Sequence, residues 1–144
     1  EYSAILKNIY AIAAGIASGL GYGDNFNAVL VSNAIREMEL FLDAVYPEHR
    51  EVNDSAYLGD LLVTAYSLFS RNRNLGNLIG KGYTVKSAVQ SMSMVAEGYY
   101  ATRGIYEIAY EKKLKTPIIN TVFSILYEGK DAEKQFKKLT EKLT

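Results

Sequence analysis

The sequence predicts an all-α protein, a single multi-helix domain over residues 1–144. Apolar residues recur three and four positions apart through most of the chain, which is the period of a helix with one buried face. No alternating run bounded by hairpin turns indicates a strand. With 144 residues, 49% of them hydrophobic, the chain has the size of one domain and enough apolar side chains for a substantial core.

The first two helices have the clearest periodicity. Apolar residues at helical spacing run from Ile5 to Leu20, and a series of glycines then ends the pattern. Asp24 or Asn25 is expected to cap a second helix, because short polar side chains accept hydrogen bonds from the first free N–H groups of a helix. Its apolar positions continue until Pro47.

Three shorter helices are predicted in the middle of the chain. One covers the leucine-rich stretch 58–65, a second begins at Ser70, and a third follows Thr84. Gly80 and Gly82 separate the last two.

Three more helices are predicted in the final part of the chain. A less regular stretch ends near Gly98 and is followed by a helix marked by the apolar residues of 105–109. Thr116 and Pro117 supply the cap and the first-turn proline of the next helix. Asp131 caps the last helix, whose lysines gather toward its carboxyl end as the helix dipole favours.

Composition excludes several functions and partners. Sixteen basic and sixteen acidic residues cancel, so no global field draws the chain to nucleic acid or to an anionic membrane. Without cysteine, and with His49 as the only histidine, neither a metal cluster nor a histidine-based triad is expected. No apolar run of membrane-spanning length is recognised, so we expect no stable membrane insertion and a cytoplasmic location. Periodicity already runs by Ile5, without a preceding cap, which favours a fragment of a longer protein.

One face of the first helix carries small residues in line with a lysine. Lys7 lies in register with Ala11, Ala14, Gly15 and Ser18, and such a face lets another group approach the backbone closely. Lys7 is therefore a candidate proton donor beside a groove, although from periodicity alone the simpler interpretation is a lysine extending to solvent. The alternative function is a non-catalytic helical protein-interaction module that buries this groove against a partner helix.

The stretch SRNRNLGNLIGKG, residues 70–82, is a candidate anion site. Ser70 at a helix start, followed by Arg71 and Asn72, can bring free backbone N–H groups and a guanidinium to one phosphate. We expect the neighbouring glycines to favour this function. An ordinary serine cap followed by solvated arginines remains the alternative.

Most carboxylates sit at spacings typical of solvated helix faces. This interpretation includes Glu37, Glu39, Glu107 and Glu111. Asp60 and Glu97, each beside a glycine, are the carboxylates that remain candidates for a site.

Five stretches in order carry a family resemblance: AILKNIYAIAAGIASGLGYGDN, YLGDLLVT, SRNRNLGNLIGKG, VAEGYYA and PIINTVFSILYEGKDA. Together they resemble the C-terminal, substrate-binding domain of bacterial NAD(P)-dependent glycerol-3-phosphate dehydrogenase, over nearly the entire chain. The resemblance implies a helical domain of the 6-phosphogluconate dehydrogenase C-terminal-like type, with the N-terminal Rossmann domain absent from this chain. It also implies reduction of dihydroxyacetone phosphate to sn-glycerol 3-phosphate with NADH or NADPH, for glycerophospholipid synthesis, and a possible homodimer.

The resemblance further implies roles for individual residues. Lys7 corresponds to the catalytic lysine, an acid in reduction and a base in oxidation. The positions that correspond to substrate contacts are Lys7, Asp60, Ser70, Arg71 and Asn72, and those that correspond to cofactor contacts are Arg71, Val95 and Glu97.

Overall fold

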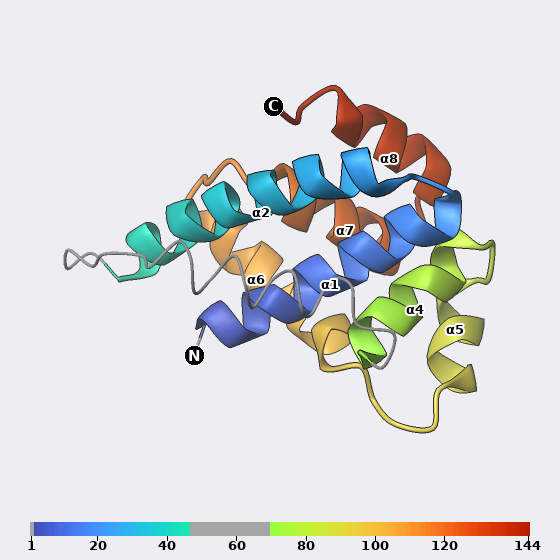
Figure 1. Cartoon of the computed structure of the whole chain (residues 1–144). Coiled ribbons are helices and arrows are strands. Elements are labelled where there is room, and N and C mark those ends of the chain that lie inside the picture. Colours follow the sequence, from blue (N-terminus) through green and yellow to red (C-terminus); the bar gives the residue numbers. More distant parts are fainter. Residues whose placement is uncertain (1, 47–69) are drawn as a thin grey trace.

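The computed structural model describes residues 2–46 and 70–144, which contain helices and no strands (Figure 1). The helices are α1 (Tyr2–Leu20), α2 (Asp24–Val45), α4 (Arg71–Gly80), α5 (Val85–Ser91), α6 (Glu97–Glu111), α7 (Pro117–Tyr127) and α8 (Ala132–Thr140). The all-α prediction is confirmed for this part of the chain. The helix predicted over 58–65, together with Asp60 and His49, lies outside the described residues.

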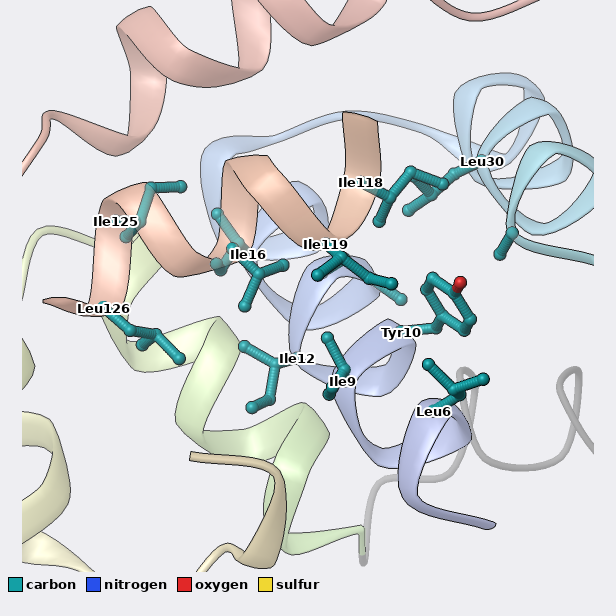
Figure 2. Packing of buried hydrophobic residues seen from close by; sticks show 14 of the residues in the cluster. Leu6, Ile9, Tyr10, Ile12, Ile16, Leu30, Ile118, Ile119, Ile125 and Leu126 are labelled. Carbon is teal, nitrogen blue, oxygen red and sulfur yellow. The ribbon is translucent and has the colours of Figure 1, made fainter. Parts of the chain in front are cut away.

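Helix α1 forms the centre of the fold. Every residue of the stretch 9–17 is buried, and α1 contacts α2, α4, α6, α7 and α8. Figure 2 shows Ile12 and Ile16 of α1 facing Ile119 and Leu126 of α7. A helix that is apolar all round is buried on all sides, because each face removes hydrocarbon from water.

The hydropathy of α1 corrects one expectation from the sequence. Among the described helices, α1 is long and apolar enough to cross a membrane by length and composition. In this fold, 56% of that window is buried inside the protein, as is typical of a core helix.

Four glycines bring α1 and α4 into backbone contact. A Cβ atom on Gly15 would lie 2.1 Å from the Arg73 carbonyl oxygen, and a Cβ atom on Gly76 would lie 2.1 Å from the Ile12 carbonyl oxygen. Gly19 and Gly80 repeat this arrangement one turn later, so the two helices run in the same direction. The small-residue groove of α1 is therefore filled by α4 of the same chain, and no partner helix is needed to cover it. Within residues 70–82, Gly76 and Gly80 thus serve helix packing, and this packing accounts for them without an anion.

Three helices begin as the sequence predicts. The Ser70 hydroxyl accepts a hydrogen bond from the Arg73 N–H at 3.3 Å, and the Thr84 hydroxyl accepts one from the Ser87 N–H at 3.1 Å. The Asp131 carboxylate does the same for α8. At α2 the prediction is wrong by one position, because Gly23 is the N-cap and Asp24 is the first helical residue.

Helix α7 is capped by a residue that we expected on a solvated face. Glu37 of α2 is only 5% exposed, and its two oxygens accept hydrogen bonds from the N–H groups of Ile118 at 2.8 Å and Ile119 at 3.0 Å. The Tyr10 hydroxyl donates a third hydrogen bond, at 3.1 Å. Burial raises the pKa of Glu37 from 4.5 to about 7, although the two N–H groups stabilise the carboxylate. Pro117 occupies the first turn as predicted, but the Thr116 side chain does not cap the backbone.

Candidate functional site

A pocket of about 240 Å³ opens where α1, α4 and α6 meet. Its lining residues are Asn8, Ser70, Arg71, Asn72 and Glu97. The first turns of α4 and α6 lie close together beneath α1 (Figure 1), because α4 runs parallel to α1 and so places its N-terminus beside the first half of α1. Four residues singled out from the sequence are thus brought to one pocket.

The first turn of α4 leaves backbone donors beside this pocket. The Ser70 hydroxyl accepts the hydrogen bond of the Arg73 N–H, so that donor is not available to a ligand. The preceding N–H groups, those of Arg71 and Asn72, have no intrahelical acceptor because they belong to the first turn. Together with the positive end of the helix dipole, these donors favour an anion at this position.

Arg71 connects the pocket to the chain segment that precedes α6. Its Nε donates a hydrogen bond to the Val95 carbonyl oxygen at 3.0 Å, and its Nη1 lies 3.9 Å from Met94 Sδ. The side chain is exposed, and the N–H groups at its tip have the planar geometry that pairs with phosphate or carboxylate. Arg71 also borders a second, open groove of about 580 Å³ that reaches Lys81 and Met92.

Asn72 lies at the bottom of the site and contacts α6. It is 8% exposed, and its Oδ1 accepts a hydrogen bond from the Gly98 N–H at 2.8 Å. Glu97, the first residue of α6, is exposed at the rim of the pocket. A carboxylate in the first turn of a helix is stabilised by the helix dipole, so Glu97 offsets part of the positive potential here.

The remaining predicted site residues lie around this pocket or beyond the described residues. Lys7 is half-buried on α1, directly before Asn8, and does not itself line the pocket. Val95 contributes its carbonyl oxygen to Arg71, while its side chain is 55% exposed. Asp60 is not among the described residues.

Asn8 also lines the pocket and was not predicted from the sequence. It shares a helical face with Ile12 and Gly15, the face that packs against α4 and α6. A polar side chain on an otherwise apolar and small face was the available signal.

The chain has counterparts among known proteins. The family model of the NAD-dependent glycerol-3-phosphate dehydrogenase C-terminus matches residues 1–137. The chain is 40% identical over 139 residues to a glycerol-3-phosphate dehydrogenase (NAD(P)+) of Desulfotalea psychrophila, covering 96% of this chain and 41% of that protein. A protein of the same name from Bacillus pumilus is 38% identical, with 96% of this chain and 40% of that protein covered.

A solved structure shows the same arrangement of helices. The crystal structure of glycerol-3-phosphate dehydrogenase from Coxiella burnetii matches with a TM-score of 0.89 and 31% identity, covering 98% of this chain and 43% of that one. The chain thus spans about two fifths of the length of the curated relatives it matches.

Proposed function

Because the chain belongs to the family of the NAD-dependent glycerol-3-phosphate dehydrogenase C-terminus, we propose that it is the substrate-binding and catalytic domain of such a dehydrogenase. The complete protein reduces dihydroxyacetone phosphate to sn-glycerol 3-phosphate, with an N-terminal Rossmann domain holding NADH or NADPH. This product feeds glycerophospholipid synthesis. The domain alone is expected to be inactive, because the N-terminal domain supplies most of the contacts that hold the cofactor.

The observation that carries this proposal is the pocket at the start of α4. Ser70, Arg71 and Asn72 line it together with Asn8 of α1. In the proposal the substrate phosphate lies at the first turn of α4, where it accepts hydrogen bonds from backbone N–H groups and from the Arg71 guanidinium. Hydrogen bonds between charged partners of this kind are about twice as strong as neutral ones.

Lys7 is the proposed proton donor. Reduction turns the C2 carbonyl oxygen into a hydroxyl, so a proton must reach that oxygen as the carbon is reduced. Lys7 lies on α1 one residue before Asn8, which lines the pocket, and its ammonium group gives up this proton and takes it back in the reverse reaction. Asp60 is proposed to bind the substrate near Lys7.

The residues near Val95 fit a nicotinamide cofactor. Met94 and Val95 are 61% and 55% exposed, and they lie beside the exposed polar groups of Arg71 and Glu97. Exposed apolar side chains beside a polar rim are typical of a surface that a ligand or a second domain covers. Arg71, Val95 and Glu97 would contact the bound cofactor, which supplies the hydride for C2.

The proposal extends to the location, the partners and the oligomeric state of the complete protein. We assign it to the cytoplasm, with the phosphorylated substrate and its own N-terminal domain as partners, and without nucleic acid or membrane insertion. A homodimer is proposed for the complete protein. Size-exclusion chromatography with light scattering on that protein tests the dimer, and a monomer over the micromolar range would exclude it.

The decisive experiment measures oxidation of NADH and NADPH by dihydroxyacetone phosphate in the complete protein. Lys7→Ala is expected to lower kcat by about 100-fold or more, the usual contribution of a positioned acid. Lys134→Ala, at an exposed position of α8, is the matched control. Turnover by Lys7→Ala at the wild-type rate would exclude Lys7 as the proton donor, and no turnover by folded wild type would exclude the proposed reaction.

A further inference from the structure

We propose that Asn72 is a positioning residue, which holds the first turn of α6 against the phosphate-binding turn of α4 so that substrate and cofactor contacts form one unit. The inference rests on the proposed function. It adds to that function a role that a substrate contact alone does not include, because Asn72 acts on the cofactor side through the backbone of α6.

The two ends of the Asn72 amide have different surroundings. Its Oδ1 accepts the hydrogen bond from the Gly98 N–H at 2.8 Å, and the residue is almost fully buried. The Gly98 N–H belongs to the first turn of α6 and has no intrahelical acceptor, so Asn72 caps a helix other than its own. The Nδ2 group is then the part of the amide that can donate to a ligand in the pocket.

The close fit of Gly98 makes this contact specific. A Cβ atom at Gly98 would lie 2.7 Å from Asn72 Oδ1, 2.9 Å from Ile12 Cδ1 and 3.0 Å from the Asn8 carbonyl oxygen. Glycine therefore allows α6 to begin directly on α1 and on Asn72. A displacement of Asn72 is transmitted to the backbone of α6, because no space separates them.

Further hydrogen bonds make the start of α6 a rigid unit. The Gly98 carbonyl oxygen accepts a hydrogen bond from the buried Thr102 hydroxyl at 2.6 Å. The Tyr99 carbonyl oxygen accepts one from the Tyr127 hydroxyl of α7. Val95 and Glu97, the proposed cofactor contacts, directly precede these residues and are exposed. Asn72 thus holds the inner side of a turn whose outer side faces the cofactor.

Coupling between the two ligands follows from this arrangement. A phosphate group bound at Arg71 and Asn72 fixes the Asn72 amide, and the hydrogen bond to the Gly98 N–H then fixes the position of the rigid start of α6 relative to α4. The cofactor then binds to a surface that is already in position. Because coupling between binding sites is reciprocal, each ligand raises the affinity for the other by the same factor, which we expect to be about fivefold or more.

The test uses the complete protein and measures the Kd of NADH by fluorescence, with and without sn-glycerol 3-phosphate. Asn72→Ala removes both ends of the amide, so the Kd of NADH is expected to rise about tenfold, the equivalent of one buried hydrogen bond, and the coupling is expected to disappear. Asn25→Ala, at an exposed position of α2, is the matched control and is expected to behave as wild type.

Asn72→Asp separates the positioning role from substrate binding. An aspartate keeps an oxygen for the Gly98 N–H but loses the Nδ2 donor and adds a negative charge beside the phosphate. We expect the Kd of NADH alone to stay near that of wild type, while the KM for dihydroxyacetone phosphate rises tenfold or more, roughly the effect of one charge-assisted hydrogen bond. Hydrogen exchange at the Gly98 amide should accelerate in Asn72→Ala and remain slow in Asn72→Asp.

Two results would overturn the inference while leaving the proposed function intact. One is an Asn72→Ala protein that binds NADH as tightly as Asn25→Ala does. The other is an Asn72→Asp protein that loses as much NADH affinity as Asn72→Ala. A wild-type protein without turnover and without NADH binding would instead overturn the proposed function and, with it, the coupling. Exchange at Gly98 would then still report whether Asn72 holds α6.

Discussion

The starts of α6 and α7 are both held by a side chain from a different helix, but the two arrangements differ in what they leave available. At α7, both oxygens of Glu37 and the Tyr10 hydroxyl are consumed by hydrogen bonds within a buried cluster. At α6, among residues 2–46 and 70–144, the neutral amide of Asn72 is bonded through its oxygen alone, and the residue lines an open pocket.

Glu37 is therefore a structural cap, whereas Asn72 is a cap at the candidate functional site. Glu37 stabilises the junction of α2 and α7 and is shielded from solvent, so its effect is measured as stability. Asn72 stabilises a junction while retaining donors that can face a ligand, so its effect is measured as binding. Substitutions at the two junctions distinguish these two roles.

Removal of the Glu37 side chain is expected to have the largest effect. Glu37→Ala leaves the N–H groups of Ile118 and Ile119 buried without an acceptor, so the free energy of unfolding should fall by about 3 kcal/mol or more. Urea denaturation measures this change. Glu107→Ala, whose side chain is 65% exposed in an ion pair with Arg103, is the control and should change stability by less than about 0.5 kcal/mol. Equal effects of the two substitutions would contradict the capping role of Glu37.

The same carboxyl group predicts a pH dependence of stability. Burial raises the pKa of Glu37 to about 7, so the folded chain binds this proton more tightly than the unfolded chain does. The protonated Glu37 carboxyl therefore contributes to the free energy of unfolding. This contribution is fully present below pH 4.5 and is lost as the pH rises through 7, with a total on the order of 3 kcal/mol. The measurement is the difference in unfolding free energy between wild type and Glu37→Gln across this range. A difference that does not change between pH 4.5 and 8 would contradict it.

Substitutions at two glycines of α6 test whether this helix begins in close contact with Asn72. Gly98→Ala places a Cβ atom 2.7 Å from Asn72 Oδ1 and should destabilise the fold by about 1–3 kcal/mol. Gly104→Ala meets no atom within 4 Å and should stabilise the helix by up to about 1 kcal/mol. Chemical denaturation of both variants checks the sign. Stabilisation by Gly98→Ala would show that α6 does not begin in close contact with Asn72.

The smallest expected effect concerns Arg71. Arg71→Lys keeps the charge but cannot donate to the Val95 carbonyl oxygen and present a planar pair of donors to a phosphate at the same time. We expect the KM of the complete protein for dihydroxyacetone phosphate to rise about tenfold, the loss of one strong hydrogen bond. Steady-state kinetics measures this, with Arg103→Lys on the exposed face of α6 as the control. An unchanged KM would remove Arg71 from the phosphate site.

The parts of the fold that could be predicted from the sequence are those determined by neighbouring residues. Ser70, Thr84 and Asp131 each cap the helix that follows them directly, so local spacing was sufficient. Glu37 was predicted wrongly, because its partners on α7 are distant in the sequence and spacing on α2 cannot show them.

The candidate site was predicted mainly through the family resemblance, and the family is confirmed by the match over residues 1–137. The residue types at 70–72 indicated an anion site, and Glu97 was a candidate as a carboxylate beside a glycine, to which the resemblance added a cofactor role. These residues line one pocket. Their individual roles stay predictions. The small face of α1 was visible in the sequence, but its occupation by α4 required Gly76 and Gly80 to be placed against Gly15 and Gly19.

The central position of α1 has a consequence for how the chain folds during synthesis. α1 is made before the other helices described here, yet α4, α6, α7 and α8, which cover it, come later in the sequence. The apolar surface of α1 therefore stays exposed until helices that are distant in the sequence have been made. Such long-range contacts slow folding, and the exposed surface favours aggregation before they form. Among the helices described here, the one made first is therefore among the last to be fully enclosed.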